Sequence, residues 1–194
     1  MYKKIILSSF IIFILSTLFH SLYNYLPCFL TSIIVPVNES IFEHMKMIFT
    51  SYMFYLLIKI LFNKKRENNL ISSFVIASLF NIVIFLIIYI PIYLLFGEKL
   101  VVTLILYFIT ILISNYLMYK IQNKKINSKI NKYSVYIIPL VYIVFTLLTY
   151  FPLKNMLFLD PTTNTYGIIK THYIEYIKDF QPFFISLYQQ ANDM

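Results

Sequence analysis

The sequence predicts an all-α protein, a polytopic transmembrane helix bundle of about five spans with an amphipathic C-terminal tail on the outer face. The chain of 194 residues is 60% hydrophobic and only 12% charged, whereas a soluble domain is about half apolar and about a quarter charged. The apolar excess falls in long runs, and basic residues flank these runs. Both features are typical of a multi-pass membrane protein.

Five apolar segments approach the length of about 20 residues that a helix needs to cross the hydrocarbon core. They cover residues 5–26, 45–62, 70–96, 100–121 and 133–151. No small-x-small cleavage site follows the first segment, so we expect a signal-anchor helix. The stretch 28–35 is too short to span and is interpreted as a re-entrant or interfacial piece. Residues 1–151 would form the transmembrane domain, and 152–194 an extracytoplasmic loop and interfacial tail.

Composition narrows the function classes. The single cysteine, Cys28, excludes an intrachain disulfide and a Cys-based zinc site within one chain. The net charge of +8 comes from residues that flank apolar spans, so a nucleic-acid partner is not expected. Membrane lipid is the expected partner, and a protein partner or a homo-oligomer stays open.

The distribution of charge predicts the orientation. With the N-terminus inside, eleven of the sixteen basic residues lie on the cytoplasmic side, whereas Glu67 is the sole acidic residue there. This asymmetry follows the positive-inside rule. We therefore expect a protein of the bacterial cytoplasmic membrane with its N-terminus in, its C-terminus out and an outer hairpin at 97–99.

The window 36–46, P-V-N-E-S-I-F-E-H-M-K, gathers polar chemistry at the outer entrance of the second span. Ser40 and Glu43 have capping-box spacing, in which each side chain takes a free backbone N–H of the other residue. Capping alone does not require Asn38, Glu39 or His44. On one helix, Glu39 and Glu43 would share a face.

A metal site is the sharper hypothesis for this window. His20 lies in the outer third of the first span, and a histidine inside a membrane span marks a functional site by default. Together with His44, Glu43 and Asp160, it would offer the nitrogen and oxygen ligands that suit zinc or another divalent ion. The candidates for acid–base or nucleophilic catalysis beside such a metal are Glu39, Glu43 and Ser40.

Polar groups after the last span could return to the same face. Asp160-Pro161 and Tyr166-Gly167 are typical of turns. Such a turn would bring the Asp160 carboxylate over the helix ends. His172 follows in a predicted interfacial amphipathic helix, on a polar face that we expect to be solvated.

The segment V-N-E-S-I-F-E-H resembles a motif, roughly V-N-E-S-x-x-E-H, of an uncharacterised family of multi-pass membrane proteins from low-GC Gram-positive bacteria. The late L-F-x-D-P and Y-G segments, here from Leu157 to Gly167, match as well. The resemblance implies membrane class and a shared site. The chain is also loosely similar to ceramidase-like intramembrane hydrolases. It differs from them in its number of spans, and it lacks their His-x-x-x-His pair.

Three functions follow as hypotheses. The first is a membrane protein whose outer polar cluster binds a cation, a lipid headgroup or a partner protein. The second is a metal-dependent hydrolase acting at the outer leaflet. The third is a small transporter, ranked last because the sequence has no mid-span carboxylate and no internal repeat.

Overall fold

The computed structural model describes residues 2–62, 69–97, 99–124 and 128–168, and within them the fold is entirely helical apart from one isolated β-bridge. Six helices follow in order: α1 (Tyr2–Tyr25), α2 (Phe29–Ile34), α3 (Ile41–Phe62), α4 (Leu70–Phe96), α5 (Leu100–Gln122) and α6 (Ser128–Tyr150). All except α2 are long and apolar enough to cross a membrane. The predicted fold class is therefore confirmed. The predicted interfacial tail, with His172, lies outside the described residues.

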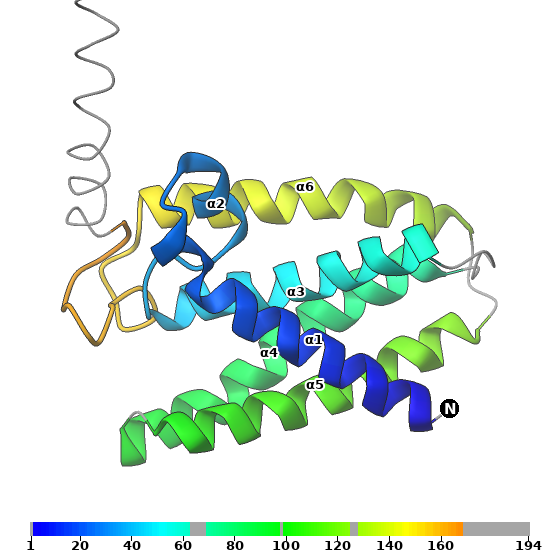
Figure 1. Ribbon diagram of the computed structural model, residues 1–194, viewed down its shortest axis with the longest axis horizontal. Coiled ribbons are helices and arrows are strands. Elements are labelled where there is room, and N and C mark those ends of the chain that lie inside the picture. Colours follow the sequence, from blue (N-terminus) through cyan, green and yellow to red (C-terminus); the bar gives the residue numbers. More distant parts are fainter. Residues whose placement is uncertain (1, 63–68, 98, 125–127, 169–194) are drawn as a thin grey trace, which may run out of the picture.

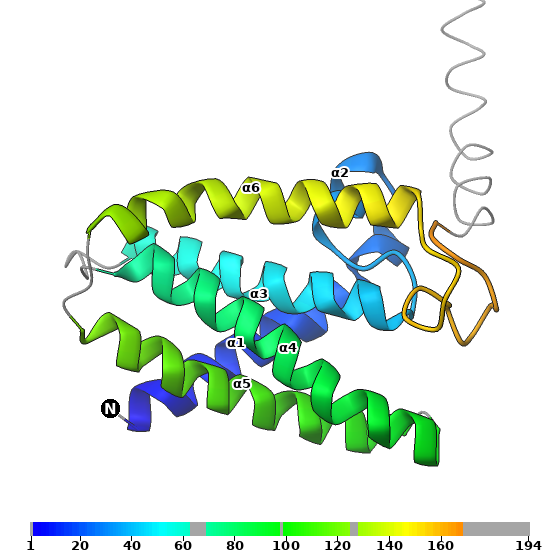
Figure 2. The same ribbon diagram turned by 180° about the vertical axis from the view of Figure 1, so that it is seen from behind.

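The five long helices alternate in direction (Figure 1). One end of the bundle carries the start of α1, the ends of α3 and α5 and the starts of α4 and α6. The other end carries the C-terminal end of α1, the short helix α2, the first turn of α3, the end of α4, the start of α5 and the segment after α6 (Figures 1 and 2). This second end, called the site end below, holds the residues that the sequence singled out.

Helix bounds differ from the predicted spans mainly where polar residues continue a helix. α3 begins at Ile41 rather than at residue 45, and α6 begins at Ser128 rather than at residue 133. Hydropathy marks the apolar run, whereas backbone hydrogen bonding continues into the polar flank for another turn. α4 ends at Phe96 and α5 begins at Leu100, on either side of the predicted hairpin, and Gly97 adopts a positive φ of 68°.

Small and polar side chains join the helices inside the bundle. The Asn115 amide of α5 donates to the Ser9 hydroxyl of α1 at 2.8 Å. About two turns farther along α1, the buried Ser16 hydroxyl contacts Ser51 of α3 and Tyr107 of α5. Such hydrogen bonds, together with close packing, hold helices together in a lipid environment. They fix α1 against α3 and α5, which is the framework of the site.

Candidate metal site at one end of the bundle

Local hydrogen bonds hold the loop that leads into α3. The Ser40 hydroxyl accepts the Glu43 amide at 3.3 Å, so the first half of the predicted capping box is formed. The second half is replaced, because the Asn38 side chain takes the Ser40 amide at 2.9 Å. The Glu43 carboxylate instead accepts the Val37 amide at 3.1 Å. Asn38 therefore takes the backbone N–H that the motif assigns to the Glu43 side chain.

This cap separates the two glutamates. Because α3 starts after Ser40, Glu39 lies in the loop before the helix and Glu43 in the first turn. The expectation that they share a helix face is therefore wrong. Glu43 is turned into the bundle with 1% of its surface exposed, whereas Glu39 remains half-buried at the surface.

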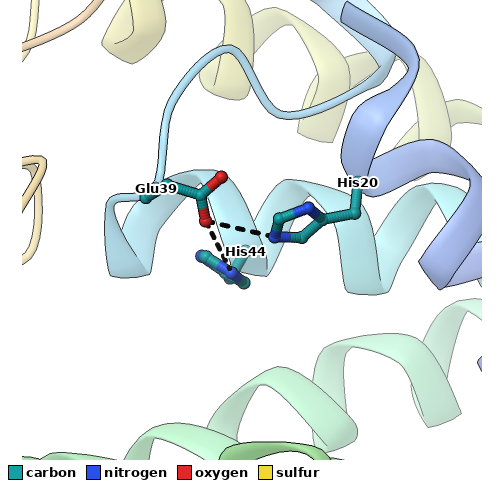
Figure 3. A group of neighbouring side chains, drawn as sticks. All are labelled: His20, Glu39 and His44. Carbon is teal, nitrogen blue, oxygen red and sulfur yellow. Dashed lines mark ion pairs between the residues drawn. The ribbon is translucent and has the colours of Figure 1, made fainter. Parts of the chain in front are cut away.

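Three side chains from three segments meet at the site end: His20 of α1, Glu39 of the loop and His44 of α3 (Figure 3). Glu39 Oε2 lies 3.1 Å from His20 Nε2 and 3.8 Å from His44 Nε2. Each residue offers one ligand atom, and these atoms all lie within 4.8 Å of one another. Ligand atoms about 2.1 Å from a tetrahedral zinc ion are about 3.4 Å apart, so only small side-chain movements would be needed.

The hydrogen bond of His44 orients its ring. His44 Nδ1 lies 2.9 Å from the Ser40 carbonyl oxygen. A carbonyl can only accept, so Nδ1 carries the proton, and the neutral ring presents its Nε2 lone pair. That nitrogen is the one facing Glu39. Histidine ligands of metals are commonly held in this way by a backbone carbonyl.

The surroundings of Glu39 favour its charged form. The hydrogen bond with His20 is the largest cause that lowers the pKa of the carboxyl below its ordinary value of 4.5. Coulombic interactions with His20 and His44 lower the pKa further, and together these causes outweigh burial and the nearby charge of Asp160. An ionised carboxylate between two imidazoles is suited to hold a cation.

Glu43 belongs to a different network, although the sequence placed it among the metal ligands. Its carboxylate forms an ion pair of 2.6 Å with Lys46 Nζ and accepts the Thr149 hydroxyl at 2.7 Å. Lys46 Nζ also donates to the Ser32 carbonyl at 2.7 Å and to the Thr149 hydroxyl at 3.0 Å. All three ammonium protons are thus used, and the network joins α3 to α2 and α6.

The segment after α6 folds back over the start of α3. Its Leu157 carbonyl accepts the Phe42 amide at 2.8 Å, which satisfies one of the free N–H groups of the first helical turn. The Phe158 ring stacks on Phe42 with centroids 4.5 Å apart. The Gly167 carbonyl accepts a hydrogen bond from the side-chain amide of Asn38 at 2.7 Å. The two sequence motifs therefore pack against each other.

Asp160 organises a turn in this segment. Its carboxylate accepts the amide and hydroxyl of Thr162 and the hydroxyl of Thr163 at 2.7–2.9 Å. Burial alone would raise the pKa of Asp160, but these hydrogen bonds outweigh it and the pKa is lowered. Tyr166 pairs with Leu159 in the single β-bridge. The Asp160 side chain acts within its own turn and is not one of the three grouped ligands.

Two adjoining cavities border the three-residue group. One, of about 110 Å³, is lined by His20, Glu39 and His44 and by residues of α3, α4 and α5. The other, of about 220 Å³, lies between α1, α3 and α5 and shares His20, Met47, Leu100, Leu104 and Tyr107 with the first. The group therefore faces open space on the α5 side. The catalytic candidate Ser40 does not, because it is 1% exposed.

Lys46 is the polar residue at this end that sequence reasoning missed. Its charge was assigned to membrane topology, yet its side chain is fully buried. A signal was present, since Lys46 follows Glu43 at the i,i+3 spacing of a helical ion pair. A charged residue inside a span is, moreover, expected to have a partner.

Comparison with known proteins adds the family. No curated protein and no solved structure shows significant similarity to the chain. A family model matches residues 1–168, which cover both motifs and all five candidate spans. The chain therefore belongs to DUF6512, a family of unknown function.

Proposed function

We propose that this protein binds a divalent transition metal, zinc in the first instance, through His20, Glu39 and His44. The observation that carries the proposal is the convergence of three ligand atoms within 4.8 Å from three separate segments. Two imidazole nitrogens and one carboxylate oxygen form a ligand set found in zinc enzymes with one position left open. All three ligands come from one chain, so neither a protein partner nor a homo-oligomer is needed to complete the set.

Burial and orientation support a bound cation. The His20 and Glu39 side chains are 35% exposed and His44 is 19% exposed, so the group is accessible yet partly shielded from water. The ring of His44 is fixed by the Ser40 carbonyl, and Glu39 is favoured as the anion. A ligand set that is already oriented loses less conformational freedom on binding.

Elemental analysis tests the proposal. The untagged protein, purified in mild detergent without chelator, is expected to carry close to one metal ion per chain. His44→Ala and Glu39→Gln are expected to lose it. His172→Ala, which removes the third histidine of the chain, is the matched control and should retain it. Equal metal content in wild type and His44→Ala would overturn the proposal.

A metal-dependent hydrolase is the second candidate function, favoured by the cavity that borders the three ligand side chains. A zinc ion held by these residues would lower the pKa of a bound water to near 7 and so would supply a nucleophile. Glu43 is paired with Lys46 and Glu39 is itself a proposed ligand, so neither glutamate is assigned as a general base. Zinc-dependent hydrolysis of a chromogenic phosphodiester or ester, lost in His44→Ala, is the test.

We also propose that the site end faces outward from a bacterial cytoplasmic membrane. The charge asymmetry of the sequence supports this orientation. The metal would then be drawn from outside the cell.

A further inference from the structure

We infer that the metal site receives a phosphodiester membrane lipid, which enters sideways from the bilayer between α1 and α5. The inference rests on the proposed metal site and names the class of ligand that fills its open position. α1 and α5 cross and then diverge toward the site end (Figures 1 and 2). Both cavities are lined by His20 of α1 and by Leu100, Leu104 and Tyr107 of α5.

The walls of the cavities connect the metal ligands to the lipid-facing surface. Leu100 and Leu104 line both cavities and are 71% and 41% exposed. In a membrane-spanning helix such exposed leucines face hydrocarbon. His20 also lines both cavities. The shared walls therefore link the lipid-exposed side of α5 to His20.

The size of the cavities fits one part of a lipid. Their volumes of about 110 and 220 Å³ are below the roughly 300–1,000 Å³ of a pocket for a drug-sized ligand. They suit a phosphodiester and the beginning of its chains. The rest of each chain would lie along the exposed leucines of α5, in contact with other lipids.

Charge favours an anionic headgroup only when the metal is bound. Among the described residues that line the two cavities, none is Lys or Arg. A divalent ion held by two neutral histidines and the Glu39 carboxylate has a net charge of about +1. This charge matches the single negative charge of a phosphodiester. Lipid binding at this position should therefore require the metal.

The test uses the cobalt-loaded protein in dodecyl maltoside, because the visible spectrum of Co²⁺ reports its fourth ligand. Dihexanoylphosphatidylglycerol is expected to shift the spectrum saturably. Glycerophosphoglycerol, the same headgroup without chains, should bind at least about tenfold more weakly. Equal affinity for the two compounds would overturn the inference and indicate a site for soluble anions.

Tryptophan substitutions on α5 test the route by which the lipid enters, because α5 contributes no metal-binding residue. Leu104→Trp should weaken binding of the lipid about tenfold, whereas the neighbouring Ile105→Trp, 56% exposed and outside both cavities, should not. Leu100→Trp and Val101→Trp form a second such pair if the first variant fails to fold. Cobalt affinity should be unchanged in all four. Equal effects within each pair would overturn the route.

The cobalt experiment distinguishes a failure of the proposed metal site from a failure of the lipid inference. A protein that takes up no cobalt would contradict the proposed metal site and the lipid inference together. A cobalt spectrum that appears but does not respond to the lipid would contradict the lipid inference alone.

Discussion

Lys46 and Glu43 form an ion pair of 2.6 Å in which the two side chains are 0% and 2% exposed. Replacing Lys46 by Met would leave the Glu43 carboxylate buried without its cation. Breaking a buried pair by removing one partner costs about 3–5 kcal/mol. We therefore expect Lys46→Met to lower strongly the temperature at which the protein aggregates in detergent. Size-exclusion chromatography after heating measures this temperature. Lys99→Met, at an exposed lysine of the same end, is the control.

Metal content separates this network from the metal site. If Lys46 and Glu43 only hold α3 against α2 and α6, folded Glu43→Gln should keep its metal. Loss of metal from a folded Glu43→Gln protein would show that the ligand set includes Glu43 after all.

The two glycines make a matched pair for backbone strain. Gly97 and Gly167 have nearly the same positive φ, 68° and 70°. A Cβ at Gly97 would meet nothing within 4 Å, whereas one at Gly167 would lie 2.8 Å from the Thr149 carbonyl oxygen. We expect Gly97→Ala to cost about 1–3 kcal/mol, because the φ of 68° and ψ of −171° at this position form a conformation that is essentially confined to glycine. Gly167→Ala should cost a further 1–3 kcal/mol, roughly, from the clash. Equal loss of thermal stability would contradict this account.

Zinc affinity should fall as the pH is lowered. The lowered pKa of Glu39 keeps this carboxylate ionised through the neutral range, and its contribution is lost only as the pH falls through that lowered value. Protons therefore compete first at the two histidines, whose ordinary pKa is about 6.5. Between pH 7.5 and pH 5.5 we expect the Kd for zinc to rise roughly a hundredfold, measured by competition with a chelator. A constant Kd would exclude histidine ligation.

The single cysteine provides a test of orientation. Cys28 lies at the site end between α1 and α2, and hydrogen bonds from Thr31 lower the pKa of its thiol. A membrane-impermeant maleimide should label Cys28 in intact cells. In a Cys28→Ala background, Asn123→Cys at the opposite end should be labelled only after lysis. The reverse pattern would invert the proposed topology.

The sequence predicted the helical architecture well because hydropathy determines which segments can enter a membrane. It also placed His20 and His44 among the ligands of one site, and the structure brings their ring centroids to 5.2 Å. The choice between Glu39 and Glu43 depended only in part on a local pattern, the i,i+3 spacing of Glu43 and Lys46. Thr149, more than one hundred residues away, and the buried Lys46 turn Glu43 inward.

The role of the segment from Leu157 to Gly167 could not be predicted from the local sequence either. Asp160 could be read as a turn residue from Asp-Pro alone. That its segment satisfies the Phe42 amide and the Asn38 side chain is a tertiary relationship. The two motifs, separated by more than one hundred residues, therefore act as one structural unit.

All three proposed ligands lie within the first 44 residues, whereas α5, which walls the cavities, begins at Leu100. During synthesis the ligands therefore emerge well before the helix that encloses them. A metal ion could be captured while the site is still open to its surroundings and be enclosed as the later spans insert. The order of the chain itself would then serve as the loading mechanism.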